Sequence, residues 1–310
     1  ETAVMSRLEF PTVPLPITRI PLEKNIRLYI KREDLIHPEI SGNKYWKLFY
    51  NVNHYLNKQP NDPKLITFGG AYSNHIAAVA AVGKMMHIST LGIIRGEELS
   101  LKYQENPTLK QASENGMEYL FVTREEYRNK ENISLELKEN FPEALIIPEG
   151  GTNDQAVEGV RHMLNNETQE FDYLCTAVGT GGTVAGLSKF CETHQQVLGY
   201  QVVQDASVEE NVFQLSGKRN VIFLEAHDRG YGKITEENIR FINSFFQKFG
   251  IPLDPVYTGK MMKKIMEQIE EGYFPEHSSV LVFHTGGLQG IAGANERLKQ
   301  QNKTEINFRN

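Results

Sequence analysis

The stretch YLCTAVGTGGTVAG, residues 173–186, decides the fold class. Its first half, Tyr173 to Val178, is an apolar run of strand length, and a glycine-rich turn leads directly into helix-like residues. A strand that passes through a tight turn into a helix must cross over before the next parallel strand can pair with it. The same alternation recurs on both sides of this stretch.

Short apolar runs alternate with helix-length segments along the chain. Residues with apolar side chains three and four positions apart, as in 43–56 and 73–86, predict the connecting helices. This alternation favours an α/β fold with mainly parallel sheets covered by helices. About nine strands suit two sheets better than one, because open twisted sheets are usually smaller. The predicted strands are 27–30, 65–68, 89–94, 119–122, 144–147, 173–178, 197–203, 221–224 and 280–283.

A turn-forming cluster, PEGGTN at residues 148–153, separates a predicted strand from a helix-like segment. Such clusters often mark the end of one structural unit. We therefore predict a smaller α/β domain over residues 51–155. The larger domain is built from both ends of the chain, residues 1–50 and 156–310.

Composition excludes several classes of protein. The 310 residues carry a formal net charge of -6, which gives no basic surface for nucleic acid. Two cysteines without C-x-x-C spacing favour reduced thiols over a disulfide framework or a zinc site, and we predict no metal site. No apolar run approaches the roughly 18–20 residues of a membrane span, and the first residues lack a signal-peptide pattern. We expect a soluble, cytoplasmic protein without a membrane partner.

The turn within the opening stretch is suited to an anion. Gly179, Gly181 and Gly182 allow close approach of the backbone, and Thr180 and Thr183 add hydroxyl donors at a helix N-terminus. The glycine spacing departs from the dinucleotide fingerprint, and the lysine of a P-loop is absent. The alternative is a tight turn with close helix packing.

A second glycine turn, residues 69–75, also follows a strand and ends with Ser73, Asn74 and His75. Ser73 and Asn74 stand where N-cap residues would, so helix capping is the simple interpretation. Their side chains and the free amides could equally hold a carboxylate. His75 by itself is more typical of a packed or surface histidine.

Two lysines, Lys44 and Lys47, begin another predicted helix. A positive helix N-terminus repels an ammonium group, so lysine there is unfavourable for a purely structural helix. Such a lysine can instead be deprotonated and used covalently, for example as a Schiff base. A solvated lysine is the alternative.

Hydroxyl groups stand in two further turns, at Tyr257 and Thr258 and, after the last predicted strand, at Thr285. They could be plain turn residues or could line one pocket. Taken with a reactive lysine, an anion cradle and a carboxylate corner, they fit pyridoxal 5'-phosphate, which needs an amine for its aldehyde and an anion site for its phosphate.

The order of these motifs resembles the family of 1-aminocyclopropane-1-carboxylate (ACC) deaminase and D-cysteine desulfhydrase. The resemblance runs from about residue 10 to 295. It implies a tryptophan-synthase-β-like (fold type II) architecture, with the cofactor between two α/β domains and a homodimer as the assembly. The motifs are KRED at 31–34, SGNK at 41–44, residues 69–75, PEGG at 148–151, residues 178–186, residues 254–260 and HTGG at 284–287.

The resemblance also implies roles for individual residues. Lys44 would bond the cofactor and move protons at the substrate Cα, with Lys47 near the phosphate. Asn74 would bond the ring oxygen, and Ser73 would hold the substrate carboxylate. The remaining expectations are phosphate binding by Gly179, Thr180, Gly181, Gly182 and Thr183, a cofactor contact by Thr285, a catalytic and substrate role for Tyr257, and substrate contacts by Asn74, His75 and Thr258.

Two positions depart from the deaminases proper, which carry Glu after the tyrosine and Leu before the Gly-Gly pair. This chain has Thr258 and Thr285 there, as the desulfhydrases have hydroxyl residues. We therefore expect a lyase of a small amino acid, D-cysteine first and ACC second. A non-catalytic ligand-binding protein on the same fold is a further hypothesis, and the missing dinucleotide fingerprint makes a nicotinamide oxidoreductase a distant one.

Overall fold

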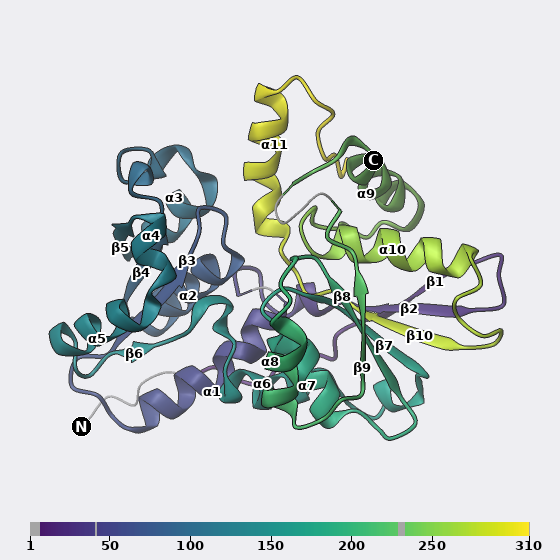
Figure 1. Cartoon of the computed structure of the whole chain (residues 1–310), viewed down its shortest axis with the longest axis horizontal. Coiled ribbons are helices and arrows are strands. Elements are labelled where there is room, and N and C mark those ends of the chain that lie inside the picture. Colours follow the sequence, from purple (N-terminus) through teal and green to yellow (C-terminus); the bar gives the residue numbers. More distant parts are fainter. Residues whose placement is uncertain (1–6, 41, 229–232, 310) are drawn as a thin grey trace.

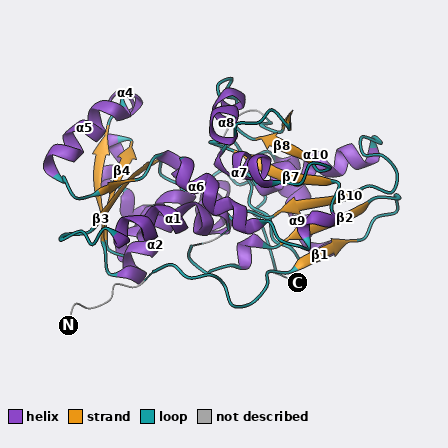
Figure 2. Ribbon diagram, turned by 90° about the horizontal axis from the view of Figure 1, so that it is seen from below, coloured by secondary structure: helices purple, strands orange, loops and turns teal. Residues whose placement is uncertain are grey.

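The computed structural model describes residues 7–40, 42–228 and 233–309, and within them it forms two separate sheets flanked by helices (Figure 1). Ser41 of the SGNK motif lies outside the described residues. The sheets lie on opposite sides of the molecule, and α1 and α6 lie between them in both views (Figure 2). No described helix combines the length and apolar character that crossing a bilayer requires.

The larger sheet has six strands, in which only β1 runs antiparallel to its neighbour. β2 and β10 pair in parallel although residues 27–31 and 279–283 stand at opposite ends of the sequence. This pairing joins the two chain ends in one unit. The strand order is β1 (Ile17–Ile20), β2 (Arg27–Lys31), β10 (Ser279–Phe283), β7 (Tyr173–Val178), β8 (Gln196–Gln201), β9 (Val221–Glu225).

The smaller sheet has four parallel strands drawn from one continuous part of the chain. All of its residues fall between 64 and 146, inside the range predicted for the smaller domain. The domain boundaries themselves stay a prediction. The strand order is β5 (Met117–Val122), β4 (Ser89–Arg95), β3 (Lys64–Gly69), β6 (Leu145–Ile146).

Helices cover both sheets, as expected for parallel strands that need crossover connections. The α-helices are α1 (Asn43–Asn57), α2 (Asn74–Met86), α3 (Pro107–Glu114), α4 (Arg124–Arg128), α5 (Lys130–Asn140), α6 (Asp154–Val160), α7 (Gly182–Phe190), α8 (Val208–Ser216), α9 (Glu236–Phe249), α10 (Thr258–Glu270) and α11 (Ile291–Gln300). Short 3-10 turns include η4 (Glu149–Gly151) and η7 (Leu288–Gly290).

Helix α1 packs tightly against α6, and the contact depends on a glycine. A Cβ on Gly159 would lie 1.8 Å from the carbonyl oxygen of Trp46, so no other residue fits without moving the backbone. The buried side chains of Leu48, Val79 and Val184 belong to one apolar cluster that runs from the small sheet through α1 to α7. This shared core fixes the N-terminus of α1 between the two sheets.

The α/β class with mainly parallel sheets is confirmed. The sequence prediction missed β1, in which only Ile20 is buried and which pairs antiparallel at the sheet edge. A strand this short leaves little periodicity to detect. The remaining nine predicted strands are all present, with ends that differ by a few residues.

Candidate active site

The first turn of α1 brings two lysine amines to one backbone oxygen. Lys44 Nζ donates to the carbonyl of Gly150 at 2.9 Å, and Lys47 Nζ donates to the same oxygen at 3.2 Å. Gly42 precedes the helix with a φ of +64°, and a Cβ there would lie 1.8 Å from the carbonyl oxygen of Thr285. Glycine at position 42 therefore allows the start of α1 to contact the backbone just after β10.

Both lysines have unusual electrostatics. Burial lowers the pKa of Lys44 to about 8, although its hydrogen bond to Lys47 and the charge of Glu149 oppose this shift. Burial and the neighbouring Lys44 amine hold the pKa of Lys47 well below its ordinary value. Among the described residues, no carboxylate lies within ion-pair distance of either amine. A buried cation without a counter-ion is unfavourable, so this pair favours a ligand that carries negative charge.

The glycine turn after β7 faces these lysines. A Cβ on Gly182 would lie 3.2 Å from Lys47 Nζ and 2.7 Å from Thr152 Oγ1, so glycine keeps the space beside the amine open. No side chain caps the N-terminus of α7 at Gly181, which has a φ of +98°. Its first amides and the Lys47 amine together form a cationic cradle.

Hydroxyl groups surround the cradle. Asn43 Nδ2 donates to Thr183 Oγ1 at 2.7 Å, which ties the start of α1 to the start of α7. Thr180 is exposed, and its hydroxyl lies 2.5 Å from that of Thr152. The structure thus brings the predicted residues 179–183 together with both lysines.

Ser73 caps helix α2, as the simple interpretation expected. Its Oγ accepts from the backbone N–H of Ile76 at 3.2 Å. A hydroxyl that accepts in this way still has its proton to donate, so the cap leaves the predicted carboxylate contact open. Asn74, the first residue of α2, accepts a hydrogen bond from Gln289 through its Oδ1.

His75 is buried with one ring nitrogen unpaired. Its side chain is 2% exposed, and Nε2 lies 2.6 Å from the hydroxyl of Thr67. That hydroxyl donates its proton to the carbonyl of Ile147 at 2.8 Å, so it accepts from Nε2–H. Nδ1 is then an acceptor, and it makes no hydrogen bond in the described structure. Burial and the Lys44 and Lys47 charges hold the pKa of His75 well below its ordinary value, which keeps the ring neutral.

The three remaining hydroxyl residues of the predicted site lie in different surroundings. The ring of Tyr257 lies against Gly179, where a Cβ would be 3.0 Å from the ring. Thr258 is fully buried, and its hydroxyl donates to Asp254 Oδ1 at 2.7 Å. This position gives Thr258 a supporting place under the site, and its predicted substrate contact stays a prediction. Thr285 is half-buried and lies beside Gly42.

The sequence interpretation missed three contributors. Residues 150–152 were interpreted as a boundary turn, and the family motif at 148–151 was given no role in the site. The Gly150 carbonyl nevertheless accepts from both lysines, and Thr152 Oγ1 lies 3.4 Å from Lys47 Nζ. Asp254 accepts from the backbone N–H groups of residues 256–258 and anchors the Tyr257 turn. Gln289 gave no signal beyond its place after the Gly-Gly pair.

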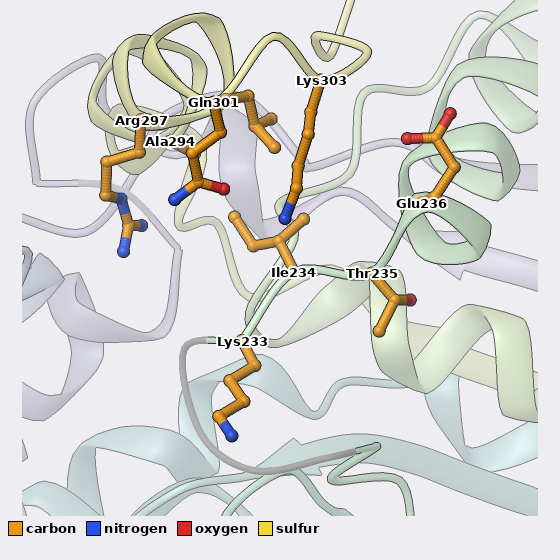
Figure 3. A pocket seen from close by; sticks show the side chains of 9 residues that line it. Lys233, Ile234, Thr235, Glu236, Ala294, Arg297, Gln301 and Lys303 are labelled. Atoms are coloured by element: carbon orange, nitrogen blue, oxygen red, sulfur yellow. The ribbon is translucent and has the colours of Figure 1, made fainter.

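Two of the cavities that the described residues form lie away from this site. One, of about 530 Å³, lies between the segment before α9 and helix α11 (Figure 3). A second, of about 350 Å³, lies beside α10. No predicted site residue lines either cavity, so the candidate site is defined by its amines and amides rather than by these hollows. The first cavity is lined by Lys233, Ile234, Thr235, Glu236, Ala294, Arg297, Leu298, Gln301 and Lys303.

Comparison with known proteins gives the family. Residues 5–286 match the family model described as pyridoxal-phosphate dependent enzyme. The chain belongs to this family. A Pyrococcus abyssi protein provisionally named 1-aminocyclopropane-1-carboxylate deaminase is 33% identical over 91% of this chain and 90% of its own length.

Two further matches point the same way. An Arabidopsis thaliana protein named bifunctional D-cysteine desulfhydrase/1-aminocyclopropane-1-carboxylate deaminase is 28% identical over 90% of this chain and 77% of its own length. A solved structure described as an ACC deaminase homologue is 27% identical, covers 96% of this chain and 97% of its own, and superposes with a TM-score of 0.79. This pyridoxal-phosphate-dependent enzyme therefore has the fold of the ACC deaminase and D-cysteine desulfhydrase family.

The described residues fit pyridoxal phosphate. An uncapped helix N-terminus and the Lys47 amine offer a site for a phosphate, and the lowered pKa of Lys44 makes its amine available to an aldehyde. The unpaired Nδ1 of His75 is a further polar atom that faces this region, since a Cβ on Gly151 would lie 3.2 Å from it.

Proposed function

We propose that this chain is a lyase that eliminates the thiol of D-cysteine, giving pyruvate, ammonia and hydrogen sulfide. The observation that carries the proposal is the pair of amines, Lys44 and Lys47, that converge on the Gly150 carbonyl with no carboxylate partner in the described part of the chain. An aldehyde would bond one of these amines, and a phosphate beside the other would balance its charge. One molecule of pyridoxal phosphate supplies both groups.

In this proposal the cradle holds the phosphate. The amides of Gly181, Gly182 and Thr183 donate to its oxygens, and Lys47 neutralises its charge from the side where Gly182 leaves space. Lys44 supplies the amine for the aldehyde. Asn74 donates to the ring oxygen, and the Tyr257 ring, which lies against Gly179, borders the bound cofactor.

The substrate contacts follow from the helix α2 turn. Ser73 and the amides at the start of α2 hold the carboxylate, because the hydroxyl proton of Ser73 stays free when its oxygen caps the helix. This grip fixes the substrate Cα next to Lys44. The substrate contact expected of His75 stays a prediction, because its unpaired Nδ1 is buried in the described structure.

When bound, pyridoxal phosphate draws the electron pair of the broken Cα–H bond into its ring. The free Lys44 amine would take the Cα proton. The C–S bond then breaks, and the sulfur leaves with its electron pair as hydrosulfide. Addition of one water to the remaining enamine carbon releases pyruvate and ammonia, so D-cysteine and water give pyruvate, ammonia and hydrogen sulfide.

The choice of D-cysteine over ACC rests on two threonines. The family resemblance places Glu and Leu of the deaminases where this chain has Thr258 and Thr285. The Thr258 hydroxyl is already committed to Asp254, so this position offers no free carboxylate. A Thr285 hydroxyl as partner of the ring nitrogen makes a weaker electron sink than a carboxylate, which suffices for a good leaving group such as a thiol.

ACC opening is the second candidate, because the Arabidopsis thaliana relative carries both activities in its name. Opening a cyclopropane ring has no thiolate to expel, so it places more demand on the electron sink. We therefore expect ACC to be the poorer substrate. A homodimer of two-domain subunits in the cytoplasm, with the smaller domain at 51–155, completes the proposal.

The proposal is tested by incubating the purified protein, loaded with pyridoxal phosphate, with D-cysteine, L-cysteine and ACC in separate reactions. We expect sulfide and pyruvate in equal amounts from D-cysteine, with little 2-oxobutanoate from ACC. Dominant 2-oxobutanoate formation would instead make the chain a deaminase. Cofactor binding without turnover of any of the three would favour a ligand-binding role.

The Lys44→Ala variant separates catalysis from background reaction of free cofactor. We expect sulfide release to fall to the level of pyridoxal phosphate in buffer. The exposed Lys102→Ala variant is the matched control and should keep full activity. Unchanged turnover in Lys44→Ala would remove Lys44 from the mechanism.

A further inference from the structure

Gln289 links Asn74 to a residue on a different helix of the smaller-sheet unit. It lies in η7, between β10 and α11 of the larger unit. Its Nε2 donates to Asn74 Oδ1, and its Oε1 accepts from the hydroxyl of Thr108 at 3.0 Å. Thr108 stands in the first turn of α3, so three separate segments meet at this one amide.

In this arrangement the Asn74 amide directs its oxygen toward Gln289. Because the Thr108 hydroxyl donates to Oε1, the nitrogen end of Gln289 faces Asn74. The oxygen of Asn74 is then occupied, and its Nδ2 turns toward Gly287, where a Cβ would lie 3.2 Å from Nδ2. No described residue accepts a hydrogen bond from this Nδ2. Asn74 thus presents a donor that the protein itself leaves unused.

We propose that Gln289 is a positioning residue that holds Asn74 with its N–H groups toward the negatively charged ring oxygen of pyridoxal phosphate. The inference rests on the proposed contact between Asn74 and the cofactor. An asparagine side chain can rotate by half a turn and exchange its oxygen for its nitrogen at little change in shape. Gln289 opposes that rotation in the arrangement found here, in which its Nε2 faces Asn74 and its Oε1 accepts from Thr108.

A contact that only held the two units together would not require the nitrogen end of Gln289 to face Asn74. A second contact already joins them nearby, since the Arg297 guanidinium lies 4.2 Å from the centre of the Tyr72 ring. A Cβ on Gly293 would also lie 3.2 Å from that ring, which shows how closely α11 approaches. Gln289 therefore differs from the Arg297–Tyr72 contact in the direction of its hydrogen bonds, not in holding the two units together.

The test changes the polarity of residue 289 and keeps its shape. In Gln289→Glu, both carboxylate oxygens only accept, so Asn74 must turn its nitrogen toward Glu and its oxygen toward the cofactor ring oxygen. We expect the dissociation constant of pyridoxal phosphate, measured by absorbance titration, to rise about tenfold or more, since a charge-assisted hydrogen bond is replaced by two facing acceptors. The absorption band of the bound cofactor should shift as well.

Matched variants separate orientation from charge and folding. Gln300→Glu makes the same change at an exposed position of α11 and should bind like the wild type. Gln289→Met removes the donor without adding a charge, and we expect a smaller loss, about threefold. The cofactor-free variants should melt within a degree or two of the wild type. Wild-type affinity and spectrum in Gln289→Glu would overturn the proposal.

A double-mutant cycle shows whether Gln289 acts through Asn74. Adding Gln289→Glu to Asn74→Ala should change the affinity by less than about twofold, because no amide remains to be turned. A full effect in that background would contradict a role through Asn74. If Asn74→Ala alone bound the cofactor like the wild type, the assignment of Asn74 itself would fail, which is a different result from failure of Gln289.

Discussion

Lys44 and Lys47 donate to the same backbone oxygen, that of Gly150, at 2.9 and 3.2 Å. Gly150 has a φ of +68°, a conformation that glycine adopts without strain, and a Cβ there would lie 2.8 Å from Thr180. One glycine carbonyl thereby gathers two amines that would otherwise repel each other. This convergence has consequences for stability as well as for chemistry.

The protein without cofactor should be destabilised by its own Lys44 at neutral pH. The folded-state pKa of Lys44 is about 8, below the ordinary 10.5, so the unfolded chain binds more protons between these values. Stability contributed at this position therefore rises with pH from about 8 to 10.5. We expect Lys44→Met to melt higher than the wild type at pH 7 and the difference to shrink toward pH 10, as measured by thermal unfolding. Lys102→Met, an exposed control, should show no such trend. An equal difference at both pH values would contradict the lowered pKa.

The same pKa sets the pH dependence of cofactor capture. Only the neutral amine attacks an aldehyde, and a group with a pKa of about 8 becomes mostly neutral by pH 9. The rate of pyridoxal phosphate capture should rise about tenfold from pH 7 to 9 and then level off. Stopped-flow absorbance would measure it. A rate that keeps rising steeply beyond pH 9 would indicate an ordinary lysine.

Gly182→Ala should weaken cofactor binding with little effect on the fold. The new methyl group would lie 3.2 Å from Lys47 Nζ and 2.7 Å from Thr152 Oγ1, within the space assigned to the phosphate. We expect a loss of about tenfold or more in affinity. Gly186→Ala on the same helix is the contrast, because its Cβ would lie 2.4 Å from Val160 in the core. That variant should lose about 1–3 kcal/mol of stability and keep the affinity of the folded fraction. The reverse pattern would place the phosphate elsewhere.

Thr258 should matter for stability before it matters for substrate choice. Its hydroxyl donates to buried Asp254, so Thr258→Ala leaves that carboxylate short of one donor and should cost about 1–3 kcal/mol in chemical denaturation. Thr258→Ser keeps the hydroxyl and should be close to the wild type. Thr258→Glu would bring a second carboxylate against Asp254 and should destabilise most. If Thr258→Ala were fully stable but changed the D-cysteine to ACC ratio, a direct substrate role would be supported instead.

Local sequence patterns were sufficient for much of the fold, and they singled out the lysines and glycine turns of the candidate site. The strand, glycine turn and helix of residues 173–186 predicted a parallel α/β sheet, and Lys44 stood out because a lysine is unfavourable at a helix N-terminus. Each of these signals depends only on residues that are close together in the sequence. The edge strand at 17–20 was missed because a four-residue, half-exposed strand has almost no period to detect.

Contacts between distant segments could not be predicted in the same way. Residues 150–152 were interpreted as a boundary turn, and only the folded chain shows that the Gly150 carbonyl faces Lys44. The substrate contact expected of Thr258 stays a prediction, and the local hydrogen bond of its hydroxyl to Asp254 was not foreseen. Gln289 carries no motif, since its role depends on helices that approach it from elsewhere in the chain.

The central claim is that Lys44 is the amine that bonds pyridoxal phosphate. Reducing the loaded protein with borohydride and mapping the modified peptide by mass spectrometry tests this claim directly, without relying on turnover of any substrate. We expect one pyridoxyl group per chain, on Lys44, and none in Lys44→Ala treated in the same way. A pyridoxyl group on Lys47 or another lysine, or no modification at all, would contradict the account.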